Sequence, residues 1–343
     1  VDKRILLLAN VGYNGQIAKY ISSFAVEFQN KYWSNVNVWS CENTEVEMVV
    51  KKLNSVGRFR NSFELIYGNG TKMLVSDELM LDSVIQLLHG SKDGMPEPFE
   101  FVKILTYLDK SDSPIVKENI MMVELLFYNY IRHDVNLRHF QLFYGILHNP
   151  STMLELIKLA WLPDNEQAKE IRKNEFAKNK NLSSIAKIAL EILHGLEAQP
   201  CENNNGVVNG QDLKKYAKEL LEAAKSEYLE RPAMYVIGKL LGNINLGEDY
   251  PPPYLGEILE ELDKDEIDDE YRRQLFNRHG FTCRAYNEGG TIERKREKKF
   301  LSYAEKTRFT YDRITIVFEK LASEYHHMGD REDVNAKLED LDN

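Results

Sequence analysis

The chain has 343 residues, of which 43% are hydrophobic and 29% are charged, and its mean hydropathy is −0.45. This composition excludes a mainly disordered chain, and no apolar run reaches the ~18–20 residues that a membrane-spanning helix needs. The net charge of −10 disfavours nucleic acid as the main partner. The three cysteines (Cys41, Cys201 and Cys283) lie far apart and match neither a disulfide framework nor a zinc motif. We therefore expect a cytoplasmic protein that binds no metal and no cofactor.

Residues 1–44 form an N-terminal segment that admits two interpretations. The apolar run Ile5–Asn10 is followed by Gly12 and Gly15, which could form a strand and a phosphate-binding turn at the start of a helix. The other interpretation is a helix end or a turn between packed helices. Because G-x-G-x-x-G and a following Lys-Ser/Thr are both missing, the second interpretation is favoured. The first leaves open a nucleotide-dependent enzyme fragment that uses the turn from Leu6 to Gly15.

Residues 45–198 predict an array of short amphipathic helices. Val46, Val49, Val50 and Leu53 follow the i, i+3, i+4, i+7 spacing of one helix face. Similar patterns, separated by Gly, Pro, Asn and Ser breaks, predict further helices at 59–66, 79–88, 99–108, 115–130, 137–147, 152–162 and 183–196. No fixed repeat length is visible, which indicates an irregular, solenoid-like helical repeat whose members bury their apolar faces against neighbours.

A polar segment separates this array from the C-terminal part of the chain. Residues 199–211 contain a run of three asparagines and a glycine and predict a flexible loop. Residues 212–343 then predict a helical cap module. Its last helix is marked by apolar residues from Ile314 to Tyr325 at helical spacing, and Gly329 is expected to end it. The acidic tail beyond Gly329 is expected to fray.

Catalytic motifs are not found in the sequence. No His-Glu-x-x-His pair is present for a zinc hydrolase, and no Gly-x-Ser-x-Gly motif is present for a serine hydrolase. Cys283 has Arg284 beside it and His279 four residues before it; a nearby cation would lower the pKa of the thiol, but a semi-buried structural thiol is the favoured interpretation. We expect no catalytic residues.

A basic stripe runs from Arg294 to Lys299, with five basic residues among six. Such a stripe could contact phosphates and make the chain a nucleic-acid-binding helical protein. Glu293, Glu297 and Glu305 are interleaved with it, which equally indicates a solvated helix face with ion pairs one turn apart. Both interpretations are kept, with the solvated face favoured.

The C-terminal part also carries a familiar set of motifs. They are Asn277-Arg278-His279-Gly280-Phe281, Glu288-Gly289-Gly290, Glu293-Arg294, Tyr303-Ala304, Leu321-Ala322, Tyr325 and Arg331-Glu332-Asp333. Together with Val56-Gly57-Arg58 and Leu147-His148-Asn149-Pro150 upstream, they resemble the C-terminal helical-repeat region of large bacterial multi-domain proteins of the STAND or NTPase-like type. The similarity spans most of residues 45–338.

This resemblance implies a sensor or scaffold module in a larger bacterial protein, with a role in anti-phage defence. Its expected partner is another protein, bound without catalysis, and nucleic acid is the less favoured alternative. The candidate binding residues are Arg278, His279, Arg284, Glu293, Arg294, Arg296, Lys298 and Lys299. Without the resemblance, the same stretch indicates a cap that closes the array. Gly280 and Gly289-Gly290 permit a compact loop, and Glu293-Arg294 then begin a helix.

Overall fold

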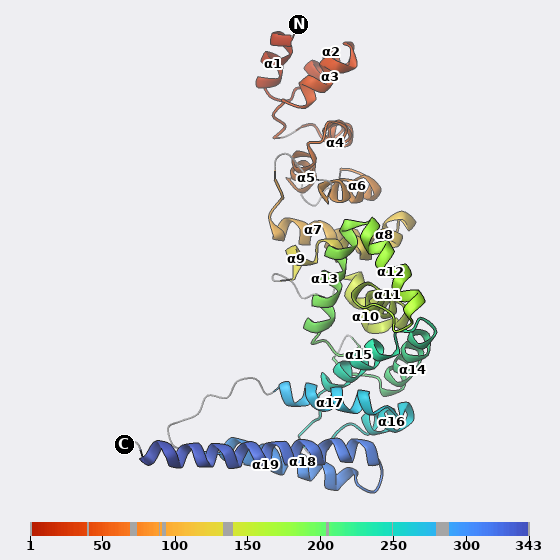
Figure 1. Ribbon diagram of the computed structural model, residues 1–343. Coiled ribbons are helices and arrows are strands. Elements are labelled where there is room, and N and C mark those ends of the chain that lie inside the picture. Colours follow the sequence, from red (N-terminus) through yellow and green to blue (C-terminus); the bar gives the residue numbers. More distant parts are fainter. Residues whose placement is uncertain are drawn as a thin grey trace. The chain divides into compact units, whose positions relative to one another are not determined.

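The computed structural model of the chain is all-helical, which confirms the predicted all-α fold class (Figure 1). The residues that it describes are 2–39, 41–68, 74–88, 90, 94–132, 140–203, 206–248, 250–278 and 288–341. They contain no strand, and the only β pairing among them is one isolated bridge between Glu202 and Val208. None of their helices combines the length and the apolar character needed to cross a bilayer. The chain divides into two compact units, Val1–Phe143 and Tyr144–Asn343.

The first unit consists of short helices in chain order. They are α1 (Asp2–Asn10), α2 (Gly15–Ile21), α3 (Val26–Trp33), α4 (Val46–Ser55), α5 (Phe59–Gly68), α6 (Asp77–Leu88), α7 (Pro98–Leu108), α8 (Pro114–Leu126) and α9 (Tyr128–Ile131). The predicted apolar face of α4 is fully buried, and Gly57 ends this helix region with a φ of 77°. Phe101 lies at the centre of an aromatic core, with ring centroids 5.0 Å from Phe63 and 4.5 Å from Phe127.

The N-terminal segment is helical where one interpretation required a strand. Asp2–Asn10 form α1, and Gly12 makes the following turn with a φ of 90°. The Asn14 side chain then caps α2 by accepting the Gln16 and Ile17 N–H groups at 2.9 and 3.2 Å. The strand expected for a phosphate-binding turn is therefore wrong. A short apolar run does not distinguish a strand from a helix, and here its buried side chains pack helix against helix.

The single long helix predicted for residues 115–130 is broken into α8 and α9. The break falls at Phe127, whose side chain is buried against Phe101. Within α8, Glu124 is fully buried and accepts hydrogen bonds from the Gln141 and Leu142 N–H groups at 3.3 and 2.6 Å. Burial and the neighbouring Asp109 carboxyl raise the pKa of Glu124 to about 9, so that it is protonated at neutral pH.

The second unit holds the longer helices. Helix α10 (Gln141–His148) runs from the first unit into the second. The others are α11 (Pro150–Ala160), α12 (Glu166–Lys178), α13 (Lys180–Gly195), α14 (Gly210–Ser226), α15 (Glu230–Gly242), α16 (Pro253–Leu262), α17 (Asp265–Asn277), α18 (Thr291–Thr307) and α19 (Asp312–Leu341). Helix α12 has no buried side chain among its residues and was not predicted, because it lacks an apolar face.

Helices α15 and α17 cross at two glycines of α15. A Cβ added to Gly238 would lie 2.7 Å from the backbone oxygen of Ile267, and one added to Gly242 would lie 2.5 Å from the Cβ of Gln274. Residues four apart share one helix face, so this Gly-x-x-x-Gly spacing creates a smooth strip against which α17 lies. The Gln274 amide also donates to Asn243 Oδ1 at 2.8 Å.

The chain ends in a hairpin of α18 and α19, which run alongside each other (Figure 1). Gly329 does not end the last helix as predicted, because α19 continues without interruption to Leu341. Instead, a Cβ on Gly290 would lie 2.6 Å from the Cα of Gly329, so the two glycines let the helices approach closely. Phe300 and Tyr325 stack between these helices with ring centroids 5.7 Å apart. Tertiary packing therefore explains Gly329 better than helix termination does.

Candidate functional site

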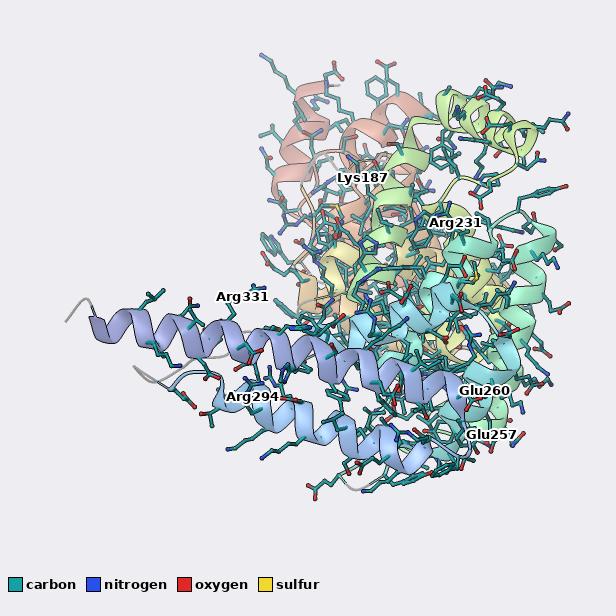
Figure 2. All side chains as sticks on the ribbon, turned by 60° about the horizontal axis from the view of Figure 1, so that its bottom comes forward. Lys187, Arg231, Glu257, Glu260, Arg294 and Arg331 are labelled. Carbon is teal, nitrogen blue, oxygen red and sulfur yellow. The ribbon has the colours of Figure 1, made fainter. Side chains whose placement is uncertain are left out.

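Arg294 of the predicted binding set ties α18 to α19 (Figure 2). Its guanidinium donates to Glu297 at 3.3 Å and to Asp333 at 3.2 Å, and it also pairs with Asp330. These carboxylates raise the pKa of Arg294 above its ordinary value. The Gly290 N–H donates to Asp333 Oδ1 at 2.7 Å, so the same carboxylate also satisfies the first turn of α18. Arg294 is thus engaged within the hairpin.

The other predicted binding residues that the structure describes lie on α18, except for Arg278 at the end of α17. Arg278 donates to the carbonyl oxygens of Gly242 and Ile244 at 3.0 and 2.8 Å, at the end of α15. Glu293 is fully buried, whereas Lys298 is exposed on α18. His279 and Arg284 lie outside the described residues.

Two further members of the basic stripe lie over aromatic rings. The Arg296 guanidinium is 5.6 Å from the centroid of Tyr325, and the Lys299 ammonium is 5.5 Å from that of Tyr303. Cation–π contacts of this kind stabilise the hairpin. They hold the charged ends of Arg296 and Lys299 over the rings. A binding role for the stripe stays a prediction.

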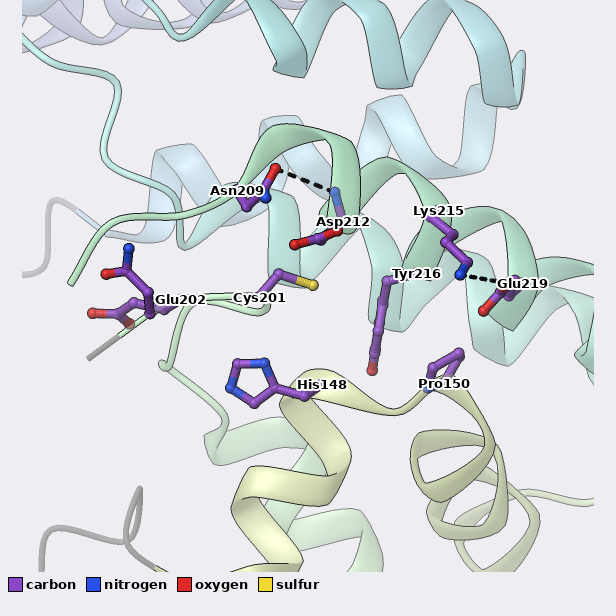
Figure 3. A pocket seen from close by; sticks show the side chains of 10 residues that line it. His148, Pro150, Cys201, Glu202, Asn209, Asp212, Lys215, Tyr216 and Glu219 are labelled. Atoms are coloured by element: carbon purple, nitrogen blue, oxygen red, sulfur yellow. Dashed lines mark hydrogen bonds and ion pairs between the residues drawn. The ribbon is translucent and has the colours of Figure 1, made fainter. Parts of the chain in front are cut away.

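A first cavity of about 410 Å³ lies in the second unit, between the start of α14 and the α10–α11 junction (Figure 3). Cys201 and His148 both line it, but burial raises the pKa of the Cys201 thiol to about 11 and lowers that of His148. Both groups are therefore neutral at neutral pH. Because a thiolate–imidazolium pair needs the opposite shifts, this cavity offers polar recognition and not an activated nucleophile.

A second and larger cavity, of about 710 Å³, is named here the aromatic groove. It lies in the second unit where the end of α11, the end of α13 and the beginnings of α15 and α17 meet. Its lining combines aromatic rings with charges of both signs, from Trp161, Leu162, Asp164, His194, Arg231, Pro232, Tyr235, Glu266, Asp269, Glu270 and Arg273. Arg231 marks this place in Figure 2, near the beginning of α15.

Backbone hydrogen bonds hold the loop that carries Trp161. This residue follows the last turn of α11, and its N–H donates to the Ile157 carbonyl at 3.0 Å. The Asp164 N–H then donates at 2.8 Å to the carbonyl oxygen of Tyr228, a residue with a φ of 58° in the turn before α15. The tryptophan is therefore positioned by ordered backbone at both sides of its loop.

Buried polar side chains fix the end of α13 against α15. Lys239 is buried, and its ammonium donates to the His194 carbonyl oxygen near the end of α13. The Asn243 amide donates to the Leu196 carbonyl oxygen at 2.9 Å. Cations and amides at a helix C-terminus satisfy carbonyl groups that the helix leaves unpaired. Because Lys239 is on α15, this contact holds His194 beside Tyr235.

Carboxylates outnumber guanidinium groups in the aromatic groove, four to two. Glu270 is buried and pairs with Arg273, and burial raises the pKa of its carboxyl. Asp269 lies 3.7 Å from Arg272 and 3.9 Å from Lys320. The groove therefore joins aromatic rings to charged side chains, and cations already pair with two of its four carboxylates, Asp269 and Glu270.

Comparison with family models, curated proteins and solved structures found no match to this chain. Within the described ranges, no three His, Cys, Asp or Glu side chains gather in a way that could hold a metal ion. The sequence does not reveal the aromatic groove, since Trp161, His194 and Tyr235 lie on three segments that are far apart in the chain. The one usable signal was the spacing of Gly238 and Gly242, which indicates a close helix crossing beside the groove.

Proposed function

We propose that this chain is a non-catalytic protein-binding module that recognises a segment of another protein in the aromatic groove. The single observation that carries this proposal is the groove itself, which combines aromatic rings with charged side chains on its rim. Aromatic and arginine side chains dominate the energetics of protein recognition, and aromatic ones bury much area with only two rotatable side-chain bonds. In a larger bacterial protein of the type that the C-terminal motifs resemble, such a module would serve as a sensor or scaffold.

Selection from a random-peptide display library on the immobilised chain tests this proposal. Enriched peptides should bind the wild type, and Tyr235→Ala should weaken them by about tenfold or more, as expected for a central aromatic contact. Tyr250→Ala is the matched control, because Tyr250 is 41% exposed and lies outside the groove lining. Circular dichroism should show the wild-type helical signal for both variants. Failure to enrich any peptide, or equal binding by both variants, would contradict the proposal.

A further inference from the structure

Three aromatic side chains from three different segments meet in the aromatic groove. The ring centroids are 6.0 Å apart for Trp161 and Tyr235, 5.9 Å for His194 and Tyr235, and 6.3 Å for Trp161 and His194. The ring planes are inclined to one another by 57–64°. Mutually inclined rings form a corner and not a flat stack, so a ligand placed over the middle of this triangle lies within ~6 Å of all three centroids.

The faces of these three rings carry no cation from the described part of the chain. Elsewhere the same chain places Arg296 over Tyr325 and Lys299 over Tyr303. The Trp161–Tyr235 and His194–Tyr235 pairs are edge-to-face contacts. Aromatic faces are the negative ends of the ring quadrupole, so the faces of Trp161 and Tyr235 that the other rings leave open attract positive charge. The cluster also lines a cavity of about 710 Å³, which leaves room for a side chain to enter.

The carboxylates around the cluster add to this attraction. Asp164 and Glu266 make no ion pair with any other described residue, whereas Glu270 is paired with Arg273. Arg231 also lines the groove without a described ion-pair partner, and Lys264 interacts electrostatically with Glu266 without forming a close ion pair. Asp164 and Glu266 are thus the two carboxylates of the groove that a ligand's donor can reach without displacing a close ion pair. A ligand that places a positive charge on the rings and a hydrogen-bond donor toward these carboxylates fits both features.

We infer that the aromatic groove binds the ammonium group of a lysine side chain from a partner protein, against the rings of Trp161 and Tyr235 and beside His194. This inference rests on the proposed function and specifies its ligand chemistry. A primary ammonium is compact and has three donors. It can therefore contact the ring faces and at the same time donate to Asp164 or Glu266. An apolar side chain of equal length gains only the burial, and an acidic one is repelled by the excess of carboxylates.

The test uses the full chain labelled with 5-fluorotryptophan and observed by fluorine NMR. The probes are N-acetyl-lysine amide, its arginine and glutamate counterparts, and N-acetyl-norleucine amide as the neutral analogue. Trp→Phe variants assign the three signals, and those of Trp33 and Trp39 serve as internal references. The lysine probe should shift the Trp161 signal saturably. The norleucine probe should bind at least about fivefold more weakly than the lysine probe.

Variants separate the ring contribution from the charge contribution. Tyr235→Phe keeps the aromatic face and should retain binding of the lysine probe, whereas Tyr235→Leu keeps apolar bulk and should lose about tenfold. Replacing both free carboxylates (Asp164→Asn with Glu266→Gln) should weaken binding and reduce its salt dependence. Tyr250→Leu should leave binding unchanged.

Several outcomes would overturn the inference. Equal binding of the norleucine probe would show purely apolar recognition, tighter arginine binding would assign the groove to guanidinium, and a response to the glutamate probe alone would assign it to anions. No shift with any probe would show that the rings are not a ligand site. If display selection yields groove-binding peptides without lysine, the inference fails while the proposed function stands. If the lysine probe binds but no peptide is enriched, the rings recognise an ammonium group, but both the proposed function and the assignment of this group to a partner protein fail.

Discussion

Replacement of Gly238 by alanine tests how closely α15 and α17 must cross. The added Cβ would lie 2.7 Å from the Ile267 carbonyl oxygen, 2.7 Å from the Glu270 Cβ and 3.1 Å from the Tyr271 backbone nitrogen. Two of these three atoms belong to the backbone of α17, so a rotamer change cannot relieve the overlap. One helix must move, and the groove residues that each helix carries move with it.

Two opposing effects decide the magnitude. Inserting a methyl group into a close-packed contact costs about 1–3 kcal/mol, whereas alanine is favoured over glycine in a helix interior by about 1 kcal/mol. We therefore expect Gly238→Ala to lower the free energy of unfolding by about 1 kcal/mol, which corresponds to a fall in Tm of roughly 2–4 °C for a domain of this size. Gly238→Val adds more volume and has the lower helix propensity, so its loss should be larger.

Urea unfolding followed by circular dichroism measures these changes. Gly195→Ala is the matched control, because Gly195 is the last residue of α13 and an added Cβ there meets no atom within 4 Å. This control should be as stable as the wild type or slightly more stable. Equal stability of Gly238→Ala and Gly195→Ala, or equal tolerance of valine and alanine at position 238, would refute the close helix crossing. The lysine probe should also bind more weakly to Gly238→Ala, because the crossing supports Tyr235.

Three further predictions concern the cores and their titratable groups. Leu321→Asp places a carboxylate at a fully buried position of α19 and should lower the free energy of unfolding by about 3 kcal/mol or more. Ile316→Asp, at a 49% exposed position of the same helix, should change it by only about 0.5 kcal/mol. Equal melting curves for the two variants would place Leu321 outside the core. The pKa of Glu124 is about 9 in the folded chain, whereas in the unfolded chain this carboxyl ionises at its ordinary, lower pKa. The free energy of unfolding of the wild type should therefore fall as the pH rises from the ordinary pKa to about 9. Urea unfolding of Glu124→Gln over the same pH range should lack this fall. The Gly290 N–H and Arg294 lower the pKa of Asp333. The ionised Asp333 carboxylate therefore stabilises the hairpin at neutral pH, and this contribution is lost as the pH falls through the lowered pKa. Asp333→Asn should speed amide exchange in α19 beyond Gly329 at neutral pH, and exchange equal to that of the wild type would contradict this.

Local pattern was sufficient for much of the helical architecture. The amphipathic spacing of α4 and α19 is visible in the sequence, and the structure buries the same residues, from Val46 to Leu53 and from Ile314 to Tyr325. The boundary between α10 and α11 was also predictable. Asn149 caps α11 by accepting the Ser151 N–H at 2.9 Å, and Pro150 occupies the first helical position. These features depend on neighbours within one or two turns of the chain.

Features that depend on distant contacts could not be predicted in the same way. The apolar run Ile5–Asn10 fits a strand or a helix equally well, and only its packing partners make it α1. Gly329 looks like a helix end, yet it lies inside α19, because Gly290 of another helix approaches it too closely for any side chain.

The sequence by itself therefore determined an all-helical chain and most of its helix positions, because hydrophobic periodicity and capping act locally. The tertiary structure alone decided where the aromatic groove lies. More than thirty residues separate Trp161 from His194, and forty separate His194 from Tyr235. They meet because the buried Lys239 ammonium holds the end of α13 against α15, and the Asp164 N–H ties the loop of Trp161 to the turn before α15. No local pattern encodes such a meeting, since it arises from close packing between helices far apart in the chain.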